Sequence, residues 1–283
     1  MKNNSDKYFP DLIGQHSVKK KLSFYLNAFK KTSQSPFLLM AGAKGLGKTE
    51  FAKAFSKNLH NEDGSKRTFL ELNCSSIKNN QAFFDQIFLP IIANQEITIL
   101  FDECHALPKD LTMAFLTIFN TESKSKKTFT WDESNFEFDF TKQTFIFATT
   151  ETDKIFPPLK DRLTSVDFEP YNEAELAEII KICTPDVSFG LGCIDSIAST
   201  IRGNARSAVK RSKEIALYCG ANESNNFSLD NFNDLCDNVG ILPLGLSNTE
   251  KQILQTLKKF GSATLTGLSA KLGLSKTALQ RDH

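Results

Sequence analysis

The stretch GAKGLGKT, residues 42–49, decides the fold. It matches the pattern GxxxxGK[ST] in full, and it lies between the apolar run FLLM at 37–40 and a helical pattern that begins at Lys48. Such a loop lets backbone N–H groups wrap phosphates at the start of a helix. The alternative, a glycine-rich turn without a chemical role, requires neither the full match nor this strand–loop–helix context.

Each residue type in this loop has an expected role. Gly45 and Gly47 let the backbone approach the phosphates closely. Lys48 is expected to reach the β- and γ-phosphates, and Thr49 to coordinate Mg²⁺. Glu50 follows directly and is counted with the nucleotide-site residues. The motif therefore predicts binding of ATP together with Mg²⁺.

A second motif, ITILFDE at 97–103, is an apolar run that ends in two carboxylates. We expect Asp102 to hold Mg²⁺ through water and Glu103 to polarise the attacking water, because catalysis by P-loop ATPases is mostly positioning and charge neutralisation. An Asp-Glu pair alone is common, but this one follows Lys48 by 54 residues (102 − 48). His105 either senses the site or caps a helix.

Three further residues are candidates for the same chemistry. Thr150 ends the run TFIFATT and either contacts the γ-phosphate or the attacking water, or simply ends a strand. Arg162 lies in LKDRL and Arg206 in RGNAR. An arginine supplied by a neighbouring subunit can stabilise transition-state charge, whereas an isolated arginine is more often a surface ion-pair residue.

Five short β-rich runs alternate with helical patterns, which predicts an α/β sandwich around a parallel sheet. Two of the runs are almost continuously apolar, as expected for strands buried on both faces. The predicted strands are Pro36–Gly42, Arg67–Cys74, Glu96–Cys104, Thr144–Thr150 and Ser165–Tyr171. Helical patterns between them include Lys48–Asn58 and Leu111–Phe119.

The strand signals stop after Tyr171, and helical periodicity follows over Glu173–Cys183, Cys193–Arg202 and Ala205–Tyr218. We therefore expect three parts. They are a P-loop core at 1–171, a helical lid at 172–240 and a partial winged helix at 247–283, with a linker at 239–246.

The third part begins with a helix-start signal. Ser247 and Glu250 have the spacing of a capping box ahead of apolar positions. Gly261 and Gly273 mark turns between three short helical patterns, and the last of these begins at Ser275. A tight turn between the last two is typical of a helix-turn-helix.

Residues 121–143 lie between the second motif and the TFIFATT run. Aromatic residues alternate with polar ones on both sides of a polar turn at 132–135, which predicts a β-hairpin with one aromatic face. This face either docks a partner or caps the core. The aromatic residues are Phe129, Trp131, Phe136, Phe138 and Phe140.

Composition narrows the setting. The net charge is +1, with 40% hydrophobic and 24% charged residues, which is typical of a soluble globular chain. The sequence has neither an apolar stretch of membrane-spanning length nor the apolar segment of a signal peptide. The six cysteines form no CxxC pair, which disfavours zinc and favours a reduced, cytoplasmic setting.

Positive charge gathers in the first 60 residues and again near residue 205. Both clusters are interpreted either as solvated helix faces or as contacts with the phosphates of a nucleotide or of DNA. The second cluster is Arg202, Arg206, Lys210, Arg211 and Lys213.

With these motifs in place, the chain resembles the RuvB family of AAA+ motors for Holliday-junction branch migration, from about Phe9 to Leu279. GLGKT at 45–49, DECH at 102–105 and ATT at 148–150 resemble its Walker A, Walker B and sensor 1 segments. The segments LKDR at 159–162, RGNAR at 202–206 and LGLSNTEKQILQTLKKFG at 244–261 resemble its arginine finger, its sensor 2 and the start of its winged helix.

The resemblance implies several residue roles. Arg162 becomes the finger that acts on a neighbouring subunit, and Arg206 becomes sensor 2. Tyr171 becomes a nucleotide contact. The segment that lies against the adenine corresponds to Ile13, Gly14 and Gln15.

The resemblance also implies a function: an ATP-driven ring, expected to be a hexamer, that moves branched DNA without sequence preference. A junction-binding protein would dock on hairpin 121–143. The alternative is an AAA+ loader or nucleotide switch that holds a protein partner in the ATP state. A catalytically poor structural relative is a third class, disfavoured by the intact motif residues.

The sequence departs from the family in three places. Ala43 and Lys44 replace two prolines, and no basic residue follows Thr150. The resemblance ends within the helix expected to carry DNA contacts, without the wing. DNA contacts are therefore expected largely from the core and lid, including the second basic cluster.

Overall fold

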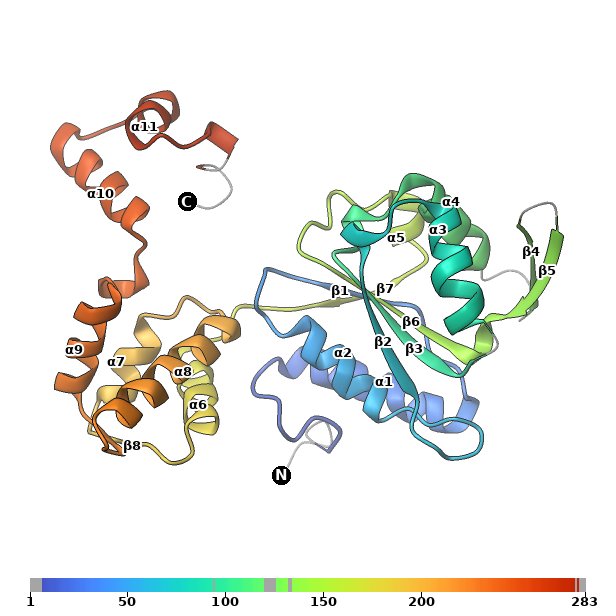
Figure 1. Cartoon of the computed structure of the whole chain (residues 1–283), viewed down its shortest axis with the longest axis horizontal. Coiled ribbons are helices and arrows are strands. Elements are labelled where there is room, and N and C mark those ends of the chain that lie inside the picture. Colours follow the sequence, from blue (N-terminus) through green and yellow to red (C-terminus); the bar gives the residue numbers. More distant parts are fainter. Residues whose placement is uncertain (1–6, 94, 120–125, 132–133, 278, 280–283) are drawn as a thin grey trace. The chain divides into compact units, whose positions relative to one another are not determined.

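The computed structural model describes residues 7–93, 95–119, 126–131, 134–277 and 279. It divides into two compact units, Met1–Tyr171 and Asn172–His283 (Figure 1). None of the helices in these residues combines the length and hydrophobicity that a membrane crossing requires.

The first unit is built on a five-stranded parallel sheet, which confirms the predicted α/β class. The strand order is β2-β3-β6-β1-β7. Residues of β1, β6 and most of β3 are buried, as their apolar runs predict. The strands are β1 (Leu38–Ala41), β2 (Thr68–Asn73), β3 (Ile97–Asp102), β6 (Gln143–Thr149) and β7 (Thr164–Asp167).

Helices cover both faces of this sheet, with α1 and α2 on one face and α3, α4 and α5 on the other (Figure 1). The helices are α1 (His16–Thr32), α2 (Lys48–Lys57), α3 (Asn80–Phe83), α4 (Lys109–Ile118) and α5 (Pro157–Lys160). A π-helical segment, Phe84–Ile92, continues α3 and contains Pro90. Because proline lacks an N–H group, it cannot continue a regular α-helical hydrogen-bond ladder.

Phenylalanines form the core between the sheet and α4. Phe101 of β3 stacks on Phe147 of β6 at a centroid distance of 5.0 Å. Phe115 of α4 packs edge-on against both rings, at 5.2 and 5.7 Å. All three side chains are fully buried. This packing holds the two strands that carry the acidic motif and the TFIFATT run.

A β-hairpin follows α4, as the sequence predicts. It pairs β4 (Lys126–Trp131) with β5 (Ser134–Asp139), and its register places Phe129 opposite Phe136. The expected turn at 132–135 was too long, since Ser134 and Asn135 already pair with β4. The expected aromatic face was wrong at Phe140, which lies in the 3₁₀ turn Phe140–Lys142 after β5 and is buried in the core. The side chains of the other four aromatic residues lie outside the described residues.

The second unit is mainly helical. It contains α6 (Glu173–Cys183), α7 (Cys193–Ser199), α8 (Ala205–Ala221) and α9 (Leu229–Val239). The expectation that strands end at Tyr171 was wrong in one detail, because β8 (Ser188–Phe189) pairs with β9 (Asn226–Phe227). Two-residue strands are too short to show a period in the sequence.

After α9 comes a short 3₁₀ turn, Pro243–Gly245, which lies within the expected linker at 239–246. Gly245 has φ 65°, and an added Cβ would lie 2.0 Å from the carbonyl oxygen of Thr200, so only glycine fits. Next come α10 (Asn248–Phe260), with the predicted Ser247–Glu250 capping box, and α11 (Leu265–Leu272).

The aromatic core generates a stability prediction. Phe115→Ala should lower the free energy of unfolding of the first unit by about 3–5 kcal/mol, because it opens a cavity against Phe101 and Phe147. Phe24→Ala is the matched control, since that ring is 65% exposed, and it should change stability by about 0.5 kcal/mol or less. Urea unfolding followed by circular dichroism measures both. Equal losses would contradict this account of the core.

Candidate active site

The GAKGLGKT loop joins β1 to α2 and depends on left-handed glycines. Gly45 and Gly47 have φ of 82° and 93°, and Gly47 directly precedes the first residue of α2. An added Cβ at Gly42 would lie 2.9 Å from both Cβ and O of Phe168. The loop therefore needs glycine for backbone conformation at two positions and also for space at a third.

Lys48 is the first residue of α2, directly after the glycines of this loop. Its Nζ donates to the carbonyl oxygens of Gly42 and Ala43 at 2.7 and 2.9 Å, and the residue is buried. Thr49 is half-buried beside it. Glu50 is exposed and pairs with Lys53 at 3.4 Å on the surface of α2. Lys48 and Thr49 thus lie where the loop meets α2, whereas Glu50 forms an ion pair on the helix surface.

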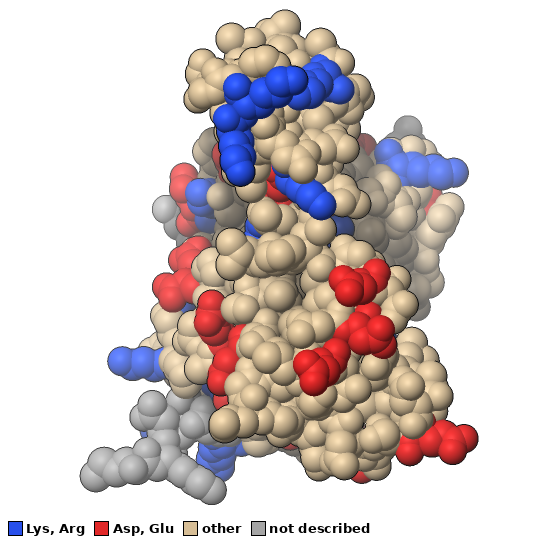
Figure 2. Space-filling view, turned by 90° about the vertical axis from the view of Figure 1, so that its left-hand side faces the viewer, with Lys and Arg blue, Asp and Glu red and all other residues tan. Residues whose placement is uncertain are grey.

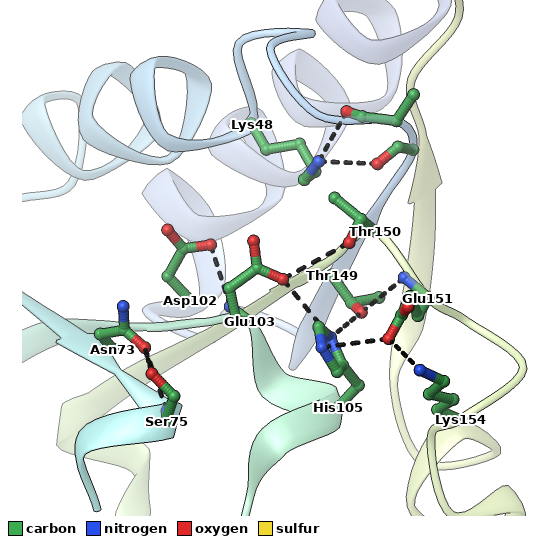
Figure 3. Close-up of polar contacts among 12 residues, drawn as sticks. Lys48, Asn73, Ser75, Asp102, Glu103, His105, Thr149, Thr150, Glu151 and Lys154 are labelled. Carbon is green, nitrogen blue, oxygen red and sulfur yellow. Dashed lines mark hydrogen bonds and ion pairs between the residues drawn. The ribbon is translucent and has the colours of Figure 1, made fainter. Parts of the chain in front are cut away.

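Asp102 ends β3 on the same edge of the sheet (Figure 3). Its Oδ1 accepts the backbone N–H of Glu103 at 3.0 Å. Burial raises the pKa of the Asp102 carboxyl above its ordinary value, and the nearby Lys48 charge only partly offsets this. A half-buried carboxylate with too little counter-charge fits a cation, so Asp102 and the Thr49 hydroxyl fit Mg²⁺.

Glu103 occupies an unusual backbone conformation. Its φ and ψ are 53° and 47°, in the left-handed region that residues other than glycine rarely adopt. Its side chain is 37% exposed. The hydroxyl of Thr150 lies 3.5 Å from Glu103 Oε2 (Figure 3). The structure thus brings together the candidate acid and the candidate sensor residue, which are separated by 47 positions.

His105 lies beside them and joins a group that sequence reasoning missed. Its Nδ1 is 3.4 Å from Glu103 Oε2, and its Nε2 is 3.2 Å from Glu151 Oε2. Glu151 also pairs with Lys154 at 2.7 Å. The available signal was the position of Glu151, directly after Thr150, and its spacing of three from Lys154.

The Ile-Gly-Gln segment before α1 contacts the end of β7. Gly14 and Gln15 are buried, and Ile13 is half-buried. The Gln15 amide donates to Glu169 O at 2.6 Å and accepts the Glu169 N–H at 3.2 Å. Two residues later, the Tyr171 hydroxyl donates to Leu46 O at 3.1 Å. These contacts connect the segment and Tyr171 to the P-loop.

The two candidate arginines have different surroundings. Arg162 follows α5 in the first unit, is half-buried, and donates from Nη1 to Pro158 O at 2.7 Å. Arg206 is an exposed residue in the first turn of α8, in the second unit. Arg162 is therefore held by the preceding helix α5, whereas Arg206 is exposed at the start of α8.

Comparison with known proteins agrees with this geometry. Residues 38–171 match the model for the ATPase family associated with various cellular activities, AAA. The Holliday junction branch migration complex subunit RuvB of Thermotoga maritima is 26% identical over 96% of this chain and 81% of its own length. RuvB of Campylobacter fetus is 28% identical over 92% of this chain and 74% of its own.

A second group of relatives matches a smaller share. The replication factor C small subunit of Methanococcus maripaludis is 28% identical over 71% of this chain and 59% of its own length.

Solved structures show the same fold. The Thermotoga maritima RuvB Holliday junction branch migration motor aligns with a TM-score of 0.76 and 23% identity, over 96% of this chain and 86% of that one. The chain therefore has the AAA+ fold, carries an AAA domain at residues 38–171, and has RuvB proteins among its homologues.

Proposed function

We propose that the chain hydrolyses ATP and, as a ring, uses that energy to move branched DNA. The observation that carries the proposal is the joint position of Lys48, Asp102 and Glu103 at one edge of the sheet, in a chain of which 96% aligns with a RuvB protein. The replication factor C relatives align with a smaller share of the chain, so the motor is favoured over a loader.

The chemistry follows from the residues at that edge. Lys48 leaves its two carbonyl partners and moves its charge to the β- and γ-phosphates. Glu103 polarises the attacking water, and Thr150 orients it or the γ-phosphate. Thr49 and Asp102 would hold Mg²⁺, which would neutralise phosphate charge when bound.

Other residues complete the nucleotide site in this proposal. Gly45 and Gly47 form the phosphate cradle, and Glu50 borders it from the first turn of α2. Ile13 and Gly14 lie against the adenine. Tyr171, whose hydroxyl donates to Leu46 O of the P-loop, contacts the nucleotide. We assign Arg206 the role of sensor 2 in the lid, 172–240, and Arg162 that of a finger for the neighbouring subunit.

The structure changes which basic residues are available for DNA. Arg202 pairs with Glu250, and both Lys210 and Arg211 pair with Glu214. Three members of the second basic cluster therefore already have acidic partners, which weakens it as a phosphate-binding surface.

The partial winged helix, 247–283, offers a more suitable surface. Its charged residues are six basic and two acidic. Figure 2 shows Lys and Arg gathered at the α10–α11 end of the second unit and acidic residues over the other helices. We propose that this surface binds the DNA backbone, since phosphate contacts need charge but no sequence. The described basic residues are Lys251, Lys258, Lys259, Lys271 and Lys276.

Two partners complete the proposal. The chain assembles with itself, because Arg162 acts on a neighbour's nucleotide, and the resemblance to RuvB favours a hexamer. A junction-binding protein docks on hairpin 121–143, in which β4 and β5 form a two-stranded sheet beyond the five strands of the core.

The first prediction concerns the acid. Glu103→Gln should keep ATP binding but lower turnover by about 10²-fold or more, because an amide cannot polarise water as a carboxylate does. Lys48→Ala should lose binding instead. Steady-state hydrolysis and binding of a fluorescent ATP analogue separate the two effects. Turnover of Glu103→Gln at the parental rate would overturn the assignment.

The second prediction concerns the ring. Arg162→Ala should stop hydrolysis, because a trans finger contributes about 10³–10⁵ in rate. Mixing Arg162→Ala chains with Lys48→Ala chains should restore part of it, since some interfaces then pair an intact P-loop with an intact finger. Full activity of Arg162→Ala in a strictly monomeric protein would contradict the ring.

The third prediction concerns DNA. Replacing Lys258 and Lys259 by alanine should weaken binding to a four-way junction and flatten the plot of log affinity against log salt, by about 0.9 for each phosphate that the protein no longer neutralises. Fluorescence anisotropy in ATP between about 50 and 200 mM salt measures this. Lys210→Ala is the matched control, because Glu214 already pairs with it. An equal loss of affinity in the control would reject the α10–α11 surface.

A further inference from the structure

His105 bridges two loops that leave neighbouring strands. It belongs to the 3₁₀ turn Cys104–Ala106, directly after β3, and its side chain is 20% exposed. On one side its Nδ1 is 3.4 Å from Glu103 Oε2, and on the other its Nε2 is 3.2 Å from Glu151 Oε2 (Figure 3). One imidazole thus lies between the candidate catalytic carboxylate and a carboxylate after β6.

The hydrogen-bonding capacity of the ring cannot satisfy both carboxylates while the ring is neutral. A neutral imidazole carries one N–H, at Nδ1 or at Nε2, and a carboxylate only accepts. With the proton on Nδ1, the N–H lies between the Thr149 oxygen at 3.0 Å and Glu103 Oε2 at 3.4 Å, so it attracts Glu103. With the proton on Nε2, the ring donates to Glu151 and presents a lone pair toward Glu103. The two tautomers therefore hold Glu103 differently.

Thr149 suits either tautomer. Its hydroxyl lies 3.0 Å from His105 Nδ1, and its oxygen accepts the backbone N–H of Glu151 at 3.0 Å. A hydroxyl can donate to a bare Nδ1 or accept from a protonated one. Thr149 is fully buried, so its oxygen is a fixed neighbour of Nδ1 in both tautomers.

Lys154 is the residue that can favour one tautomer of His105 over the other. Its Nζ contacts the same Glu151 oxygen at 2.7 Å and offers Glu151 a second donor. The positive charge of Lys154 weakens the attraction of Glu151 for a proton on Nε2, so loss of this contact would favour the Nε2 tautomer.

The loop that carries Lys154 borders an open cleft of about 600 Å³. The cleft is also lined by His105, Met113 and Phe156, and the last two are more than 40% exposed. The Lys154 side chain is 59% exposed, so it can leave Glu151 by changing its rotamer. Ile155, the next residue, is buried in the core and holds the backbone of the loop. Downstream it leads into α5 and to Arg162.

We propose that His105 is a positioning residue that sets the orientation of Glu103 according to whether Lys154 holds Glu151. This inference rests on the proposed role of Glu103. It connects the segment that carries the finger for a neighbouring subunit with the acid of the chain's own site, through side chains of a single chain.

Kinetics of ATP hydrolysis test the proposal. His105→Ala should lower kcat by roughly 10- to 100-fold and leave KM for ATP within about twofold, because it misplaces Glu103 without touching the phosphate loop. His105→Asn should retain most of kcat, since its amide places a donor near the Nδ1 position. A purely structural role for His105 would lower thermal stability in both variants and would not distinguish them by kcat.

A double-mutant cycle tests the selection by Lys154. Lys154→Ala should lower kcat severalfold in the parental chain and have no further effect in His105→Ala, because residues that act through one another are not additive. Asp153→Ala is the matched control, because it also removes a charge from this loop but does not alter the contacts among Glu103, His105 and Glu151. It should leave kcat unchanged. Additive effects of Lys154→Ala and His105→Ala would overturn the proposal.

The outcomes also separate this inference from the proposed function. If Glu103→Gln hydrolyses ATP normally, the catalytic assignment fails and the positioning role fails with it. If Glu103→Gln is inactive while His105→Ala keeps the parental kcat, the catalytic assignment stands and the positioning role alone is rejected.

Discussion

The parallel register of the central sheet is the constraint on which the site depends. Ala41 pairs with Thr149, and Phe101 pairs with Phe147, so the carboxyl ends of β1, β3 and β6 lie at nearly the same level. The phosphate loop, the acidic pair and Thr150 all leave the sheet at this edge. Ligands of open parallel sheets bind at this edge for the same reason. A one-residue slip of β3 would turn its buried residues to the opposite faces.

The parts of this fold that sequence predicts well have long signals. The apolar runs at 37–40 and 97–101 are buried strands, and the capping box at Ser247 marks the observed start of α10. The missed parts have short or contradictory signals. β8 and β9 have two residues each, and the π-helical segment at 84–92 contains a proline. Local pattern cannot resolve such elements because tertiary packing stabilises them. Helix α9 was missed although Ser228 and Asn231 form a capping box at its start.

Side-chain partners were harder to predict than strands. Arg202 and Glu250 are 48 positions apart in the sequence and form an ion pair, and Gly245 lets the intervening chain approach Thr200 closely. Arg67 is another case. Its guanidinium is buried, donates to Thr144 Oγ1 at 2.7 Å and lies 3.6 Å from Glu96. From the sequence alone, Arg67 and Arg202 would be counted as surface charges. In the structure Arg67 lies beside Glu96 and Arg202 beside Glu250.

The main chain and the side chain of Glu103 are held to different degrees. Its left-handed backbone costs of order 1 kcal/mol, and such strain persists only where the surroundings over-determine the conformation. Buried Phe101 lies two residues before it and buried Cys104 one residue after, so the core fixes the main chain. The side chain, by contrast, is partly exposed, and its contacts with Thr150 and His105 are 3.5 and 3.4 Å long. A rigid backbone with loosely held carboxylate oxygens suits the regulated acid that we propose, because the reach of the side chain is constant while its direction can respond to its neighbours.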